Sequence, residues 1–532
     1  MSAVCAGHEG VVSATSFSQR NERANHHADN NPTACCVDAR RHPAARKRLH
    51  GHSIVSTTEK NTGGSATSAT LGTSLKPRHI TMISIAGVIG AGLFVGSANA
   101  IEKAGPAVII SYALAGTLVV LVMRMLGEMA TANPNTGSFS VYSHRALGRW
   151  AGFSVGWLYW WFWVLVIPVE ATAAAEIFSK LIGGEQWIWA LAVTLLLTAT
   201  NLISVGNYGE FEFWFALIKV VAIIAFIAIG VVAILGLFPG SETSGVSHLW
   251  EPDGFLPNGS TAIISAMLVT MFSFMGTEIV TIAAAESPDP EKGITRAVNS
   301  VIWRISIFYI GSIFVVVALV PYNQLDDGSY QTVLETIGIP ASAQIMDVVV
   351  LTAVASCLNS ALYTASRMLY SLGERHEAPA AVKKLTANGV PWVSVLASMV
   401  LGFLAVIGNY VLPDKIFGYL LATSGAVALF VYLSIAVSQL VLGKSMRARD
   451  QVPAVRMWLF PYLTGLVIVF IVAVLILMAF DADQRDAITL STISAVIIVA
   501  IGVWMQKRHG DRGYDAPDAA KAAAPGTSGP EK

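Results

Sequence analysis

The stretch that decides the fold reads Ser84-Ile-Ala-Gly-Val-Ile-Gly-Ala-Gly-Leu-Phe-Val-Gly96, an apolar segment with glycine at positions 87, 90, 92 and 96. Gly87 and Gly90 share one face of a helix, whereas Gly92 departs from that face and the two close glycines weaken the helix. One interpretation is a close helix-packing surface of small residues. The other is a discontinuous membrane helix whose exposed N–H groups bind a carboxylate at mid-membrane.

A second interruption follows at Phe272-Ser273-Phe-Met-Gly276-Thr277-Glu278. An ionisable Glu278 beside Gly276 in an apolar run is costly unless it faces a cavity or a partner. In our assignment of spans the two interruptions fall in the first and the sixth span, five helices apart. Such pairs are typical of an inverted repeat whose substrate site lies at the repeat interface. We predict an all-α integral membrane protein of about 12 transmembrane helices, with a 5+5 inverted-repeat (LeuT-type) fold plus two further helices.

The composition agrees with a membrane protein. Only 13% of the 532 residues are charged and 54% are hydrophobic, whereas soluble proteins carry about 25% charged residues. Positions 79–505 hold only 44 charged residues, too few for a soluble exterior, so the surrounding solvent must be largely lipid. The net charge of zero argues against a nucleic-acid-binding protein. The 4 cysteines, three of them in the polar N-terminal tail, exclude a disulfide scaffold.

Apolar stretches of about 20 residues recur through this region, and they must be helical because hydrocarbon offers no partner to unpaired backbone groups. The twelve predicted spans are 80–100, 107–126, 154–178, 187–205, 213–237, 261–284, 302–321, 345–370, 391–411, 416–441, 457–479 and 487–505. Thirteen Lys and Arg fall on one side of the membrane and four on the other. The positive-inside rule therefore predicts a multi-pass protein of the cell membrane with both termini in the cytoplasm.

The two ends of the chain differ from the middle. Residues 1–75 are rich in Ser, Thr, Asn, Ala and His without apolar periodicity, and we expect a disordered cytoplasmic tail. Residues 76–507 form the twelve-helix domain, and 508–532 form a disordered C-terminal tail. Four potential metal ligands of the first tail match no tetrahedral spacing, so we predict no metal site: His26, His27, Cys35 and Cys36.

Among the ionisable residues within predicted spans outside the interruptions, those that matter most for function are Glu170, Lys219 and Asp347. A buried lysine suits a proton carrier because burial disfavours its charge and a neighbouring charge can restore it. The alternative is a lysine that extends to the membrane interface. Lys219 lies about 11 Å from the expected helix start near Glu212, which favours the proton carrier. Asp347 lies near the outer end of its span, where we expect it to be solvated.

The eighth span carries polar residues at helical spacing after Cys357. Asn359, Tyr363, Arg367 and Tyr370 follow one another by three or four residues and form one polar stripe. This stripe suits the wall of a water-filled path. A helix–helix interface joined by hydrogen bonds is the alternative.

Several of these passages resemble the amino-acid permeases of the amino acid–polyamine–organocation superfamily, and within it the bacterial GABA (4-aminobutyrate) permeases. The resemblance covers about Leu75 to Lys507. Its most specific passages are LKPRHITMISIAGVIGAGLFVGSA (75–98), NYGEFEFWFALIKVVAI (207–223), SAMLVTMFSFMGTEIVTIAAAES (265–287) and SCLNSALYTASRMLYSL (356–372).

The resemblance implies a proton-coupled importer that works by alternating access, with H⁺ as coupling ion and no cofactor. It implies that the substrate carboxylate meets the N–H groups of Gly90, Ala91 and Gly92. The amine would meet the sixth-span break, which comprises Phe272, Ser273, Gly276, Thr277 and Glu278. Glu170 or Glu278 would be the counter-ion of a distant amine, and Lys219 matches the lysine of proton-driven relatives. The translocation path would include Cys357, Asn359, Tyr363 and Arg367.

The expected partner is therefore a small zwitterionic amino acid, GABA or a related ω-amino acid, with membrane lipid around the protein and no obligate protein partner. Proline, arginine, lysine or an aromatic amino acid is the alternative substrate on the same scaffold. A channel would tend to show rings of pore-lining charge. An enzyme would need a catalytic set, and the sequence holds no HExxH or Walker pattern.

Overall fold

The computed structural model describes residues 89–134, 139–203, 208–238, 244–251, 253–279, 281, 284, 289–325, 328–482 and 484–509. Across these residues every regular element is a helix. The long helices are α4 (Val108–Ala132), α6 (Arg149–Ile182), α7 (Gln186–Ile203), α8 (Tyr208–Ile234), α12 (Pro290–Arg304), α15 (Ser342–Glu374), α16 (Trp392–Val411), α17 (Pro413–Ala448), α18 (Tyr462–Phe480) and α19 (Arg485–His509).

Shorter helices complete the described part of the chain. They are α2 (Ala91–Phe94), α3 (Gly96–Ala104), α5 (Phe139–Leu147), α9 (Thr261–Ser265), α10 (Met267–Phe274), α13 (Ser312–Leu319) and α14 (Ser329–Thr336), with short 3₁₀ turns η1 (Gly105–Ala107), η2 (Ser247–Leu249) and η4 (Ala380–Lys383) and a π-helical segment η3 (Ile305–Gly311). The predicted metal ligands of the first tail lie outside the described residues.

A helical segment occupies each predicted span. In the described ranges, nine helical runs are long and apolar enough to cross a membrane, and Gln186–Leu202 and Thr261–Phe274 are shorter apolar helices. The run Ala91–Ala132 covers the second predicted span and the described end of the first. The first span before Ile89 lies outside the described residues.

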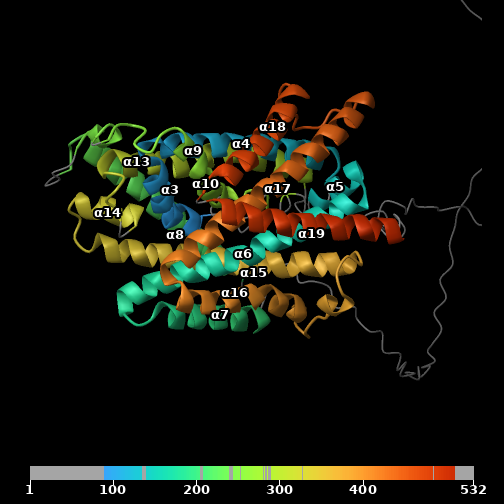
Figure 1. Ribbon diagram of the computed structural model, residues 1–532, viewed down its shortest axis with the longest axis horizontal. Coiled ribbons are helices and arrows are strands. Elements are labelled where there is room, and N and C mark those ends of the chain that lie inside the picture. Colours follow the sequence, from blue (N-terminus) through green and yellow to red (C-terminus); the bar gives the residue numbers. More distant parts are fainter. Residues whose placement is uncertain are drawn as a thin grey trace, which may run out of the picture. The chain divides into compact units, whose positions relative to one another are not determined.

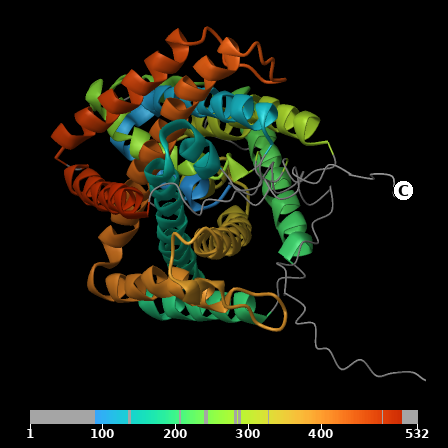
Figure 2. The same cartoon turned by 90° about the vertical axis from the view of Figure 1, so that its right-hand side faces the viewer.

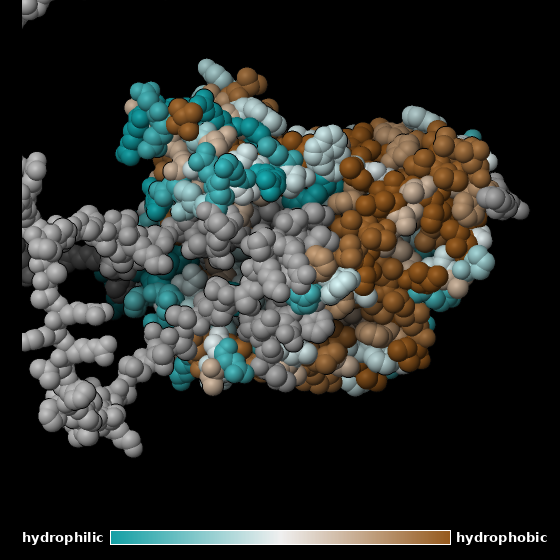
Figure 3. All heavy atoms as spheres, turned by 180° about the vertical axis from the view of Figure 1, so that it is seen from behind, coloured by the Kyte–Doolittle hydropathy of each residue, from teal (hydrophilic) through white to brown (hydrophobic). Residues whose placement is uncertain are grey.

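Burial separates central from peripheral helices. In α6 the most apolar window is 83% buried, whereas in α19 it is 22% buried. Figure 2 shows α6 and α15 in the interior, with α7 and α16 side by side at one edge. The peripheral helices expose large apolar side chains such as Leu466 and Ile493, and Figure 3 shows hydrophobic residues gathered over much of one face. These surfaces suit hydrocarbon, because exposed apolar side chains cost nothing in lipid.

The short helices lie where the sequence predicted interruptions. In Figure 1, α3 and α10 lie among long helices that run the length of the bundle. Gly90 is extended, and α2 begins after it. Helix α10 ends at Phe274, Met275 is extended, and Gly276 has a φ of 94°, a conformation that glycine adopts without strain. The predicted break in the sixth span is therefore present at the predicted residues.

Helices α10 and α17 approach very closely at Gly425. A Cβ atom at this position would overlap the backbone carbonyl oxygen of Leu268. A carbonyl within a helix cannot rotate away as a side chain can, so only glycine permits this contact.

Gly425→Ala is therefore expected to lower the free energy of unfolding by about 1–3 kcal/mol, the usual cost of overpacking. Gly418→Ala on the same helix is the matched control, because nothing lies within 4 Å of a Cβ there. Thermal unfolding of both purified variants in detergent measures the difference. Equal midpoints for the two variants would contradict the close contact.

Candidate functional site

The first helix break is built around the backbone N–H of Ala91. This N–H donates to both carboxylate oxygens of Glu170 from α6, at 3.1 and 3.0 Å. Glycine is required at the preceding position, since a Cβ on Gly90 would lie 2.5 Å from Glu170 Oε1 and 2.8 Å from Cys357 Sγ. The break thus brings α2, α6 and α15 together at a buried carboxylate.

The second break is built around Glu278. Its two carboxylate oxygens accept hydrogen bonds from the Gly276 N–H, both at 3.1 Å, and the side chain is fully buried. Tyr159 of α6 and Tyr432 of α17 interact electrostatically with this carboxylate. Their hydroxyls are buried at the Glu278 carboxylate and form no hydrogen bond of standard geometry among the residues that the structure describes. Such weakly bonded groups can bind a polar ligand at little cost in existing hydrogen bonds.

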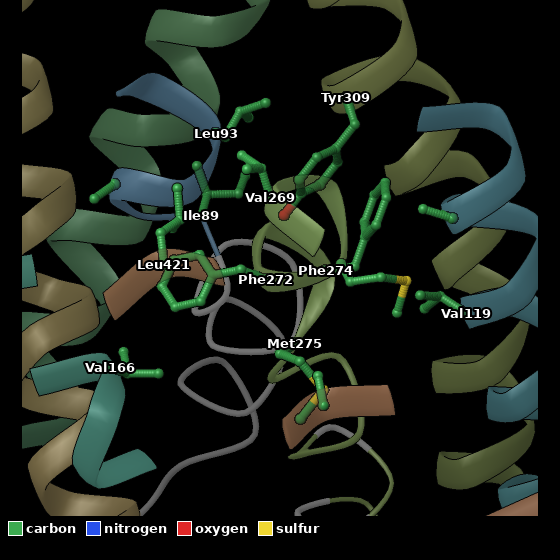
Figure 4. Packing of buried hydrophobic residues seen from close by; sticks show 14 of the residues in the cluster. Ile89, Leu93, Val119, Val166, Val269, Phe272, Phe274, Met275, Tyr309 and Leu421 are labelled. Carbon is green, nitrogen blue, oxygen red and sulfur yellow. The ribbon is translucent and has the colours of Figure 1, made fainter. Parts of the chain in front are cut away.

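The two breaks are in direct contact. A Cβ on Gly92 would lie 2.8 Å from the Phe272 ring and 3.0 Å from the Ser273 Cα. Figure 4 shows Phe272 beside Ile89, with Leu93 and Val269 nearby. Two backbone interruptions from distant parts of the sequence therefore form one site, which needs glycine because helices cannot otherwise approach so closely.

A cluster of charged residues adjoins the first break through Glu170. We define this cluster as Glu170, Lys219 and Glu212. Lys219 is fully buried and interacts electrostatically with both carboxylates. Helix α8 begins at Tyr208, so Lys219 lies about 16 Å from its start rather than the expected 11 Å. The complete burial of Lys219 agrees with an interior position and not with a side chain that extends to the membrane interface.

Comparison with known proteins identifies the family. A family model described as amino acid permease matches residues 79–512. The chain belongs to the amino acid permease family. It is therefore a multi-pass membrane transporter and not an enzyme.

The permease is 58% identical over 452 residues to a probable GABA permease of Pseudomonas aeruginosa, covering 84% of this chain and 95% of that protein. It is 58% identical over 438 residues to the gamma-aminobutyric acid permease of Escherichia coli, covering 81% and 94%. With the aromatic amino acid transport protein AroP of Corynebacterium glutamicum the identity is 42%, covering 79% and 92%.

Among solved structures, a manganese transporter of Eremococcus coleocola matches with a TM-score of 0.50 and 13% identity, over 82% of the permease and 96% of that chain. At this identity the likeness concerns the fold alone. It confirms the all-helical LeuT-type fold that the paired interruptions predicted.

The predicted polar stripe on α15 divides between two neighbourhoods. Cys357 lies against Gly90 and interacts with Glu170. Asn359 instead accepts a hydrogen bond from Asn201 of α7 at 2.9 Å. The guanidinium of Arg367 stacks on the Tyr363 ring at 3.4 Å. Cys357 is thus part of the site, whereas the Asn359 contact joins two helices.

One end of the permease is open. A cavity of about 1010 Å³ reaches Phe94 and Val95, close to Ala91, and is lined farther out by Lys180, Gln331 and Asp347. Asp347 is only 3% exposed and accepts a hydrogen bond from Gln331 Nε2 at 2.9 Å. Our expectation that Asp347 is solvated was therefore wrong, because its side chain is buried in the cavity wall and bonded to Gln331.

At the opposite end, polar side chains of different helices pair with one another. Glu128 of α4 pairs with Arg447 of α17 at 2.9 Å. Arg375 donates to Ser140 of α5 at 2.8 Å and pairs with Glu377 at 3.3 Å. Burial raises the pKa of the Glu377 carboxyl, and Arg375 lowers it to a smaller extent. The described residues thus show a cavity at one end of the bundle and paired charges at the other.

Sequence reasoning missed three residues of the site: Glu212, Tyr159 and Tyr432. Tyr159 and Tyr432 resemble core aromatic residues in their sequence context. Glu212 could have been found, because it precedes Lys219 by seven residues and thus shares its helix face. Across the described ranges, no three His, Cys, Asp or Glu side chains are placed to share a metal ion.

Proposed function

We propose that the permease imports GABA or a related ω-amino acid across the cell membrane, coupled to protons. The observation that carries this proposal is the 58% identity to GABA permeases over 94–95% of their length. The site supports it through two backbone interruptions, each beside a buried carboxylate. Such a site can bind the two separated charges of an ω-amino acid.

In the proposed binding mode the substrate carboxylate accepts from the N–H groups at Gly90, Ala91 and Gly92. The amine binds at the sixth-span break between Phe272 and Glu278, which includes Ser273, Gly276 and Thr277. Glu278 is the better counter-ion for the amine, because Glu170 lies at the amide that the substrate carboxylate would occupy. The hydroxyls of Tyr159 and Tyr432 supply acceptors for the remaining amine protons.

The position of Glu170 suggests how substrate and proton are linked. Two ionised carboxylates repel each other and cannot share the Ala91 N–H in a buried site. Substrate binding therefore favours a protonated or displaced Glu170, and Lys219 is the neighbouring group that exchanges this proton. Proton binding and substrate binding then stabilise each other, as linkage requires.

The proposed topology places both termini in the cytoplasm, with residues 1–75 and 508–532 as tails on the domain 76–507. The excess of Lys and Arg in the loops of that side supports this orientation. The cavity that contains Asp347 then opens to the outside, and the end closed by Arg375 and Glu128 faces the cytoplasm. The path beyond the site runs along Cys357, Asn359, Tyr363 and Arg367.

Uptake of labelled GABA into proteoliposomes tests the proposal. Under an inward proton gradient, the vesicles should accumulate GABA above the outside concentration. Without a gradient, the inside concentration should only reach the outside concentration. Equal accumulation in both conditions would refute proton coupling, and absence of GABA uptake would refute the substrate.

An aromatic amino acid is the second candidate substrate, because AroP of Corynebacterium glutamicum is 42% identical. A competition panel with GABA, phenylalanine, proline, arginine and lysine ranks the candidates. GABA should inhibit labelled uptake at the lowest concentration. Stronger inhibition by any of the others would identify that amino acid as the preferred substrate.

A further inference from the structure

Glu212 is a buried carboxylate that the proposed transport step does not yet use. Its side chain is fully buried on α8. Oε1 accepts a hydrogen bond from Ser356 of α15 at 2.7 Å, Ser360 of the same helix also lies at the carboxylate, and Oε2 forms no hydrogen bond of standard geometry within the described part of the chain. Burying a carboxylate completely is costly even beside two hydroxyl groups, so a purely structural role explains Glu212 poorly.

Glu212 and Lys219 face the same environment. They are seven residues apart, which is two helical turns or about 10.5 Å along α8, and so share a face from which their long side chains converge. The two groups interact electrostatically. From the helices packed around them, Cys357 and Ser360 of α15 and Glu170 of α6 face the same cluster.

The charges of this cluster do not balance. One ammonium and two carboxylates carry a net charge of −1 when all are ionised, and a buried net charge is strongly disfavoured. A single added proton makes the cluster neutral. One carboxylate would be enough to neutralise the charge of Lys219. The second carboxylate allows the cluster to bind one additional proton.

The three groups also lie in a defined order. Glu170 contacts the first helix break, Lys219 interacts electrostatically with both carboxylates, and Glu212 lies only four residues from the start of α8 at Tyr208. A proton that moves from the substrate site through Lys219 therefore has Glu212 as its next acceptor toward that end of the bundle.

We propose that Glu212 receives the transported proton from Lys219 and releases it at the end of the bundle where α8 begins. This inference rests on the proposed function. In the transfer, an N–H bond of the Lys219 ammonium breaks and an O–H bond forms on Glu212 Oε2, which leaves both groups neutral. The carboxyl then gives its proton to water and is ionised again, while Lys219 accepts the next proton from Glu170.

Glu212→Gln in the reconstituted full-length protein tests this role. A pH-sensitive dye inside the vesicles reports proton entry when substrate is added, and counterflow of labelled substrate reports movement through the site without net proton transfer. Substrate-dependent proton entry should fall by about tenfold or more, with counterflow within about twofold of wild type. Glu210→Gln is the matched control, since Glu210 is exposed two residues earlier on the same helix.

Each result decides the question. Wild-type proton entry in Glu212→Gln, or a folded variant that loses counterflow as well, would overturn the relay. If the variant does not fold, Ser356→Ala replaces it, because that change keeps every charge and removes the donor to Oε1. It should shift the pH profile of uptake by about one unit, and an unchanged profile would overturn the role. A wild-type protein without substrate-driven proton entry would instead refute the proposed function.

Discussion

Lys219→Ala is expected to abolish proton-driven accumulation of substrate while counterflow persists. Lys219 is the one cation of the Glu170, Lys219 and Glu212 cluster, and it interacts with both carboxylates. Without it, two buried carboxylates remain that are neutral only when both bind protons, because an unpaired buried charge is too costly. The cluster then no longer exchanges a single proton during the cycle.

Accumulation under an inward proton gradient and counterflow without a gradient, in the same vesicles, measure the two effects separately. Accumulation should fall to the level of equilibration, a loss of about 100-fold or more in the gradient-driven rate. Lys444→Ala is the control, because Lys444 is an exposed lysine of α17. Undiminished accumulation in Lys219→Ala would remove this lysine from the mechanism.

Glu170→Gln is expected to make substrate affinity independent of pH. In the proposed binding mode, ionised Glu170 competes with the substrate carboxylate for the Ala91 N–H, whereas protonated Glu170 does not. Affinity should therefore be highest at low pH and decrease as the pH rises through the ionisation of Glu170, by at most about tenfold per pH unit. A neutral glutamine keeps the shape of the side chain and cannot change its charge.

Equilibrium binding of labelled substrate to the purified protein, at several pH values between about 5 and 8, measures how affinity changes with pH. The slope is determined for the wild type and for Glu170→Gln. Glu185→Gln is the control, because Glu185 is an exposed carboxylate in the turn between α6 and α7. It should retain the wild-type slope. A wild-type affinity that does not change with pH, or a Glu170→Gln variant with the wild-type slope, would refute the competition.

Much of the fold was predictable because the membrane imposes simple rules on a sequence. Runs of apolar residues long enough to cross the bilayer must be helices, and the structure has a helical segment at each predicted span. The breaks were predictable for a related reason. Gly276 and Glu278 are both unfavourable within a membrane helix. Their presence close together therefore indicates a helix break at a functional site.

The site was predictable only in part. Lys219 and the two breaks were found from single positions that are costly in lipid. Glu212 was not recognised, because its importance comes from the pair it forms with Lys219 and from Ser356 on another helix. Cys357 and Asn359 belong to one polar segment, yet they face the first helix break and a neighbouring helix respectively.

The sequence by itself determined the membrane class, the helical spans, the positions of both breaks and the resemblance to amino acid permeases, because each follows from the local cost of a residue in hydrocarbon or from a contiguous motif. Only the tertiary structure decided that Glu170 occupies the Ala91 amide and that Glu170 and Glu212 both interact with Lys219. These are contacts between helices distant in the chain. Helical periodicity gives the face on which a side chain lies, whereas the packing of the bundle determines what that face meets.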